Sequence, residues 1–286
     1  MALKINYNFQ SDFTHMNLLR TEHNLNKNLE RLATGHRINR AADDAAGLYI
    51  ADQLKTYAIS LDQGTRNAQD GISIAQIAQG SLSEVYNILN DVKAKTIQAA
   101  NDSNDDETRK IIQNDINKLV DVIGKIFTDT EFNGKKIFSS GAATTFTIHY
   151  GGRKDQELVI TGATAGATGG ATDGAASTVT LGATRYTIDV TSQTKANASV
   201  STVDALIKAI DKEAGKFGSA QIELEKIISN NETQAVNTRD AESRIRDIDF
   251  AKEMSEFTKN NILMQSGTAM LAQANQQSQL VLQLLR

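Results

Sequence analysis

Apolar residues recur at alternating steps of four and three along the last part of the chain, residues 250–286. This spacing predicts an amphipathic helix with a coiled-coil seam in which about half of the positions are apolar. Ile262 and Leu263 lie beside the seam and widen the apolar stripe. A helix with this much apolar surface is not stable alone in water, so it requires a partner. The seam positions are Phe250, Met254, Phe257, Asn261, Met264, Thr268, Leu271, Asn275, Ser278, Leu282 and Leu285.

A second amphipathic segment, near the start of the chain, is the predicted partner. It places leucines on one face, and Gly35 is suited to end the helix. Chain termini of a domain often lie close together, which favours pairing of the two segments. Two helices bury too little surface to be stable, so we expect other chains to complete the burial. The residues assigned to this polymerising pair are Leu18, Leu25, Leu29, Leu32, Phe257, Met264, Leu271, Leu282 and Leu285.

The same spacing predicts a helical bundle between these two ends. One long helix is expected to start within residues 39–44, with Asp43 and Asp44 in its first turn, and to continue to about Ala100. Helical spacing returns over residues 203–228, before a polar stretch at 229–246. The predicted bundle core comprises Leu61, Ile72, Leu82, Leu89, Ile116, Leu119, Ile123, Ile210, Phe217 and Leu224.

A polar turn at residues 101–106 separates the long helix from the next one, so these two helices are expected to form an antiparallel hairpin. Asp105 or Asp106 is suited to cap the second helix of this hairpin. Residues 128–134 are expected to close it.

The pattern changes to strict alternation after this hairpin. Phe146, Ile148 and Tyr150 alternate with polar residues, and a turn at 151–155 leads to Leu158 and Ile160, which predicts a β-hairpin. Residues 161–177 consist almost entirely of Gly, Ala and Thr, and we expect a loose surface loop there. Apolar residues between Val179 and Val190 predict another pair of short strands.

The order of helices, a small β insert and further helices predicts a mainly α, elongated fold. The long predicted rods exceed what a compact globule requires. The predicted domains are the paired terminal coiled-coil helices, residues 1–43 with 246–286, and the helical bundle, residues 44–245, with a β-hairpin tip at about 144–200 and no large extra outer domain.

Composition agrees with long unbroken helices and excludes several functions. The chain has 286 residues and no proline, although average usage would give roughly fourteen. Its formal net charge of -4 provides no electrostatic footprint for nucleic acid, and the absence of cysteine excludes disulfides and thiolate sites. No apolar run approaches a membrane span, and the N-terminal segment lacks the features of a cleaved secretory signal. We expect a cytoplasmic protein or one exported without a cleaved signal.

No residue pattern supports catalysis or cofactor binding. The histidines, His15, His23, His36 and His149, have no metal-ligand spacing. Residues 102–113 resemble a calcium loop superficially, but Glu107 stands where glycine is required and Gln113 where the bidentate glutamate is required. No phosphate-binding loop occurs, and Asp43 and Asp44 are better interpreted as first-turn residues than as a general acid and base. No catalytic, metal or cofactor residue is therefore assigned.

A basic cluster near the end of the first predicted helix has two interpretations. Arg31, His36, Arg37 and Arg40 could contact an acidic surface of a neighbouring subunit, or they could form a solvated face.

Several longer motifs resemble the two terminal signatures of the bacterial flagellin family. They occur in the family's order and cover roughly residues 1–140 and 200–286 of the chain. The matching segments are residues 31–47, 66–76 and 132–134 for the N-terminal signature, and residues 243–251, 271–276 and 284–286 for the C-terminal signature.

The resemblance implies a structural subunit of the extracellular flagellar filament, which serves motility. In this family the terminal helices form the inner core of a helical homopolymer and the bundle forms an outer layer. Members are exported through the flagellar export apparatus, without a cleaved signal, and their partners are an export chaperone, the filament cap and hook-junction proteins.

The chain departs from one pattern within the family. Members that the flagellin-sensing Toll-like receptor recognises carry an arginine followed by a Glu-Leu-Ala stretch on a bundle helix. Here Asp91 stands at the arginine position and Lys95 replaces the leucine. A reversed charge and a charge within an apolar contact each weaken an interface, which predicts weak or absent recognition.

Two other functions stay open at this point. A hook–filament junction protein or an adhesin-like relative would use the same terminal helices. An enzyme or binding module on a helical rod would require convergent polar groups in a pocket, for which the sequence contains no motif.

Overall fold

The structure is a computed structural model that describes residues 8–170, 172 and 174–284, with only the backbone described at 277–284. The chain divides into two compact units. Unit 1 comprises Met1–Tyr57 with Val236–Arg286, and unit 2 comprises Ala58–Ala235. The division made from the sequence lies nearer the chain ends, at 43 and 246, and the assignment of these parts within an assembly stays a prediction.

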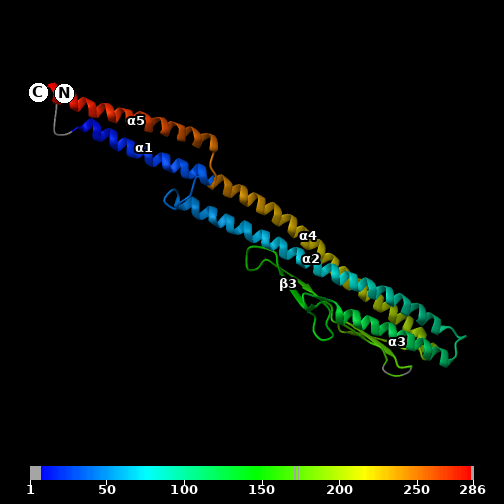
Figure 1. Ribbon diagram of the computed structural model, residues 1–286. Helices are drawn as coiled ribbons and strands as arrows, with labels where there is room; N and C mark the ends of the chain where they lie inside the picture. The colour runs from blue at the N-terminus through cyan, green and yellow to red at the C-terminus, as the bar shows by residue number, and fades with distance from the viewer. Residues whose placement is uncertain (1–7, 171, 173, 285–286) are drawn as a thin grey trace. The chain divides into compact units, whose positions relative to one another are not determined.

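Helices dominate the chain, with short strands between the third and fourth helix (Figure 1). This arrangement confirms the mainly α fold with long terminal helices and a small strand region. The elements are α1 (Phe9–Thr34), α2 (Ala45–Ala100), α3 (Asp106–Asp129), β1 (Glu131–Phe132), β2 (Lys135–Lys136), β3 (Thr145–His149), β4 (Glu157–Thr161), β5 (Ala165–Thr168), β6 (Ser177–Leu181), β7 (Thr184–Ile188), α4 (Gln193–Arg246) and α5 (Phe250–Leu284).

In unit 1, α1 and α5 lie side by side and antiparallel, which confirms the predicted pairing (Figure 1). Asn8 caps α1 by accepting a hydrogen bond from the Ser11 amide at 3.1 Å. The helix ends at Gly35, whose φ of 74° lies in the left-handed region that glycine adopts without strain. The predicted end of this helix is therefore confirmed.

The start of α2 differs from the prediction. The helix begins at Ala45, so Asp43 and Asp44 precede its first turn instead of lying within it. The Asp44 carboxylate accepts a hydrogen bond from the Gly47 amide at 2.9 Å, as a capping residue does. The helix then continues to Ala100, as predicted.

In unit 2, the helices bury a continuous apolar core. Phe138 makes edge-to-face contacts with Phe127 and Phe217, at centroid distances of 5.3 and 6.3 Å. Ile72 and Leu119 are partly buried and pack against this core. The other residues assigned to the core from the sequence are buried: Leu61, Leu82, Leu89, Ile116, Ile123, Ile210, Phe217 and Leu224.

The predicted β-hairpin is confirmed as β3 paired antiparallel with β4, with Phe146 opposite Ile160. It lies along the helices of unit 2 (Figure 1). The Asn67 side chain of α2 donates to the His149 carbonyl at 2.8 Å, and the Asn231 side chain of α4 donates to the Tyr150 carbonyl at 2.6 Å. Two helices therefore hold the end of β3.

The loose loop expected at residues 161–177 is wrong. Ala165–Thr168 form strand β5, which pairs with β6 and packs on α3. A Cβ atom at Gly124 of α3 would lie 2.5 Å from the Ala167 carbonyl oxygen, and the Gly169 amide donates to Asp121 at 2.7 Å. The small side chains that suggested a loop are what let the strand backbone approach the helix.

Helix α4 is also longer than predicted. The polar stretch at 229–246 is part of one continuous helix, and it contains neither glycine nor proline, the two residues that disfavour a helix most. Asn231 and Ala235 are buried within it.

A two-residue hairpin that sequence analysis did not predict follows α3. Strands β1 and β2 are joined by Asn133 and Gly134, both with positive φ (50° and 76°). Asn-Gly is the preferred pair for such a turn, which gives the family motif at residues 132–134 a conformational reason.

Gly64 tests whether the β3–β4 hairpin depends on close contact with α2. A Cβ atom there would lie 2.1 Å from the Tyr150 carbonyl oxygen. We expect Gly64→Ala to destabilise unit 2 by about 1–3 kcal/mol in urea unfolding, although alanine favours a helix. Gly80→Ala is the control, because no atom lies within 4 Å of its Cβ position on the same helix. It should be neutral or stabilising by up to about 1 kcal/mol, and an equal effect of both changes would contradict the close contact.

Candidate assembly surface

The contact between α1 and α5 is a regular antiparallel seam. On both helices the buried and half-buried positions recur at alternating steps of three and four, as in a coiled coil. On α1 the seam comprises Ser11, Thr14, Leu18, Thr21, Leu25, Asn28 and Leu32, and on α5 it comprises Glu253, Phe257, Asn260, Met264, Gly267, Leu271 and Ala274.

The seam on α5 therefore differs from the one read from the sequence. Phe257, Met264 and Leu271 belong to both, but Phe250 and Met254 are exposed. The observed seam alternates large apolar residues with small or polar ones. The sequence prediction assumed apolar residues at every step, so the seam positions between Phe257, Met264 and Leu271 were predicted wrongly.

The residues assigned to polymerisation lie in different places. Leu18, Leu25 and Leu32 of α1 and Phe257, Met264 and Leu271 of α5 are half-buried in the seam, whereas Leu29 is exposed. Leu285 lies outside the described residues, as does the side chain of Leu282. The role of this set in assembly stays a prediction.

A second set of apolar residues points away from the seam. Sequence analysis assigned Leu29, Phe250 and Met254 to the helix pairing and did not predict a separate outward surface. On α1, Phe9, Phe13 and Met16 follow one another at steps of four and three, and Phe9 is 68% exposed. The rings of Phe9 and Phe13 stack at 6.1 Å. A contiguous exposed apolar stripe such as Phe9, Phe13 and Met16 marks a candidate surface for binding another protein. We call this set the exposed apolar set; its members are Phe9, Phe13, Met16, Leu19, Leu29, Phe250, Met254, Ile262, Leu263 and Met270.

The segments before α2 and before α5 are joined by backbone hydrogen bonds. The Arg37 amide donates to the Arg246 carbonyl at 2.6 Å, and the Ile248 amide donates to the Gly35 carbonyl at 3.1 Å. Ile38, in the first of these segments, is fully buried. We call residues 35–44 and 245–249 the joint. The joint accounts for much of the two long motifs at 31–47 and 243–251.

The basic cluster serves the joint and the seam. The Arg37 guanidinium donates to the Ile245 carbonyl at 2.8 Å, and His36 contacts Asp247 at 3.1 Å. Arg40 pairs with Glu30 at 3.0 Å, and Arg31 lies 3.6 Å from Glu253. Arg31, His36 and Arg37 therefore make contacts within the chain, whereas the Arg40 side chain is 73% exposed, as a solvated face predicts. Contact with a neighbouring subunit stays a prediction.

Asp43 forms a structural ion pair as well. Its carboxylate lies 2.6 Å from the Lys27 ammonium. The hydrogen bond from Lys27, supported by the amides of Arg40 and Asn39 and opposed by partial burial, lowers the pKa of Asp43 to about 2. A carboxylate held ionised in this way fits a structural role better than general acid–base catalysis.

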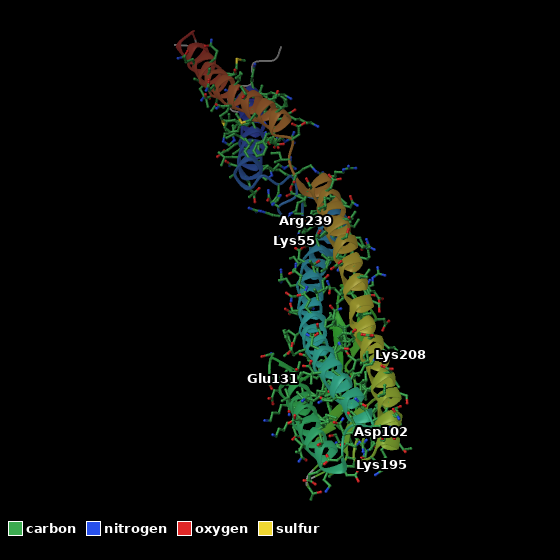
Figure 2. The ribbon with its side chains drawn as sticks, turned by 90° about the vertical axis from the view of Figure 1, so that its right-hand side faces the viewer. Lys55, Asp102, Glu131, Lys195, Lys208 and Arg239 are labelled. Atoms are coloured by element: carbon green, nitrogen blue, oxygen red, sulfur yellow. The ribbon has the colours of Figure 1, made fainter. Side chains whose placement is uncertain are left out.

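No site for a metal or a catalytic reaction is visible among the described residues. They contain no group of three or more His, Asp or Glu side chains placed to hold a metal ion. Asp102 lies at the turn between α2 and α3 (Figure 2). Asp105 caps α3 by accepting from the Thr108 amide at 2.8 Å, as one of the two predicted caps. A cleft of about 770 Å³ along α1 and α5 is lined mainly by charged and polar side chains, several of them already paired.

None of the helices in the described part of the chain is both long and apolar enough to cross a membrane.

These features define a class of protein. A long antiparallel helix pair with exposed apolar side chains, attached to a helical bundle, is typical of a structural protein that associates with copies of itself. The chain matches the Bacterial flagellin N-terminal helical region over residues 5–143 and the Bacterial flagellin C-terminal helical region over residues 200–285. It belongs to the bacterial flagellin family.

Similar proteins match along nearly their whole length. A flagellin of Halalkalibacterium halodurans is 38% identical over 282 residues, which cover 99% of both chains. A flagellin of Bacillus subtilis is 38% identical over 304 residues, which cover 99% of this chain and 100% of the relative. A flagellar filament 33 kDa core protein of Treponema phagedenis is 36% identical, with 99% of each chain covered.

The Lys27–Asp43 pair predicts how acid affects unit 1. Because the pKa of Asp43 in the folded chain lies below the ordinary aspartate value of 3.8, the pair stabilises the fold fully above that pH and loses its effect as the pH falls towards about 2. We expect Asp43→Asn to lower the thermal midpoint of unit 1 at pH 6, and the difference from the unchanged chain to vanish near pH 2. Asp91→Asn, at an exposed position, is the control. A constant difference between pH 6 and pH 2, measured by circular dichroism, would contradict the role of the pair.

Proposed function

We propose that the chain is a structural subunit that polymerises into the helical filament of the bacterial flagellum and serves motility. The observation that carries this proposal is the exposed apolar set on α1 and α5. The family is structural, and relatives that match along their whole length are named as flagellins and as a filament core protein. The match to filament subunits at both ends favours this function over a junction or adhesin-like protein.

In this proposal the terminal helices form the inner core of the filament. Most seam residues of α1 and α5 are only partly buried within one chain, and the side chains of the exposed apolar set are about half exposed or more. Packing many copies around one axis would cover both. Unit 2, which has its own closed core, then has no need of neighbours for folding and suits the outer layer.

The proposed partners follow from the family and the exposed helices. The subunit would be exported without a cleaved signal through the flagellar export apparatus, with an export chaperone bound to its apolar terminal segments. The filament cap and the hook-junction proteins would contact it at the two ends of the filament. We assign no catalytic activity, cofactor or nucleic-acid partner.

We further propose weak or absent recognition by the flagellin-sensing Toll-like receptor. Asp91 is exposed on α2, and Lys95 forms an ion pair with Asp115 of α3 at 3.0 Å. A receptor surface suited to an arginine and a leucine would meet a carboxylate and a paired ammonium instead.

Substitution of the exposed apolar set tests polymerisation. We expect the double change Phe9→Ser and Phe13→Ser to raise the critical concentration for filament growth at least about tenfold, because each lost ring removes about 1.5–3 kcal/mol of burial. The seeded protein would be measured by electron microscopy and sedimentation. Gln10→Ser, at an exposed position of the same helix, is the control and should polymerise normally. Normal filaments from the double variant would contradict the proposed surface.

The receptor prediction is tested with purified monomer on reporter cells. We expect little signal from the unchanged chain and a gain from the double change Asp91→Arg and Lys95→Leu, which restores the charge and the apolar contact. Asp70→Arg, a charge reversal elsewhere on α2, is the control. Strong activation by the unchanged chain would overturn the prediction.

A further inference from the structure

In the seam between α1 and α5, each layer pairs a large residue with a small or polar one. The exception is the Ser11–Ala274 layer, where both residues are small. The register is fixed by direct contacts: a Cβ atom at Gly267 would lie 3.0 Å from Leu18, and the Ser11 hydroxyl lies 3.0 Å from the Asn275 side chain. In heptad order the layers are Ser11–Ala274, Thr14–Leu271, Leu18–Gly267, Thr21–Met264, Leu25–Asn260, Asn28–Phe257 and Leu32–Glu253.

Size alone does not determine which helices pair. Each helix carries large residues in one row and small or polar residues in the other row. Two copies of α5, or two copies of α1, would also combine large with small residues if they packed antiparallel. Many copies of both helices would lie close together in a filament, so pairing between like helices is a real competitor.

A buried polar cluster distinguishes these alternatives. It consists of Asn28 and Arg31 of α1 with Glu253 and Asn260 of α5. Asn28 and Asn260 are only 7% and 8% exposed. In the amide orientation that satisfies its neighbours, Asn28 donates to Glu253 at 3.1 Å and accepts from the Asn260 side chain at 3.1 Å.

Glu253 connects the cluster to a charge on the other helix. Its side chain is 12% exposed and lies 3.6 Å from the Arg31 guanidinium, so one carboxylate receives both an amide and a cation from α1. The Asn28 oxygen also accepts from the Phe257 amide at 3.2 Å. Within this cluster α1 supplies the cation, Arg31, and α5 supplies the carboxylate, Glu253.

We propose that this cluster restricts pairing to unlike helices, so that α1 binds α5 and neither binds a second copy of itself. The inference rests on the proposed function, in which copies crowd together. Like pairing of α5 would place two Glu253 carboxylates in the seam without the Arg31 cation, and like pairing of α1 would leave Arg31 without the Glu253 carboxylate. An unpaired buried charge costs more than the packing of a seam layer returns. Polar residues in a coiled-coil seam commonly set partner choice in this way, at a cost in stability.

Introduced cysteines report the pairing directly, because the chain contains none of its own. The pair Ser11→Cys with Asn275→Cys joins α1 to α5, since these side chains are already within hydrogen-bond distance. A disulfide within one chain reports unlike pairing, and a covalent dimer reports contact between two chains. Asn275→Cys alone reports α5 beside a second α5. Non-reducing gels separate the products after oxidation of full-length monomers and of seeded filaments.

With the cluster intact, we expect disulfides within one chain to dominate for the cysteine pair, and few dimers for the single cysteine. Arg31→Glu places a second carboxylate beside Glu253, and we expect it to reduce the disulfide within the chain roughly fivefold and to raise dimers. Glu253→Arg should do the same from the other helix. Combining both changes restores an opposite-charge pair and should recover most of the disulfide within the chain.

The matched control reverses an exposed ion pair on α5, Lys259 with Glu256, which lies outside the cluster. It should leave the product ratio unchanged.

The proposal is overturned if the single reversals have no effect, if the combined change is no better than either single change, or if the control shifts the ratio equally. If a reversal prevents folding of unit 1, the combined change still decides, because the proposal requires it to restore the disulfide within the chain and to lower the dimers of the single cysteine; refolding without that recovery would overturn it. Failure of the unchanged protein to form filaments would instead refute the proposed function, and the monomer cross-links would still report the pairing.

Discussion

Two helices cannot bury all of their apolar side chains against each other, and the terminal part of this chain is built on that constraint. Seam residues such as Leu18 and Met264 are only partly buried, and Phe9 and Ile262 are exposed. More apolar residues in the seam would stabilise the single chain but would leave less free energy to gain from association. The apolar side chains that remain exposed favour association with other chains.

The joint explains why the family's longest motifs are polar and rich in arginine. Its main contacts are backbone hydrogen bonds between Arg37 and Arg246 and between Gly35 and Ile248, with side chains such as Asp43 and His36 holding the turns. A helix pair of this kind does not fix its own register. Anchoring one end of both α1 and α5 to the same few residues fixes the register from which the whole seam follows.

How much of this could be predicted from sequence depends on side-chain size. The long helices and the β3–β4 hairpin were predictable because Leu, Ile and Phe recur with a clear period. Strand β5 was not, because its Gly and Ala residues carry no periodic signal and pack through the backbone against Gly124. The α5 seam was only half predictable. Asn260 and Gly267 occupy seam positions but carry no apolar side chain by which the seam could be recognised. Phe9, Phe13 and Met16 do carry a helical period, so the outward surface of α1 could have been found by examining a second stripe.

The polar residues of the seam show that the stability of the helix pair and the specificity of the pairing have different sources. Asn28, Asn260 and Glu253 contribute less to stability than leucines of similar size would. Their hydrogen bonds within the protein only replace the hydrogen bonds to water that they lose on burial. Leucine at all three positions would strengthen the pair, and would equally strengthen every pairing of like helices. In a protein whose copies accumulate side by side, the energy difference between the correct and incorrect partners matters more than the strength of the correct contact. Burial of the outward apolar side chains can then drive association between chains, while the polar residues in the seam determine which two helices pair.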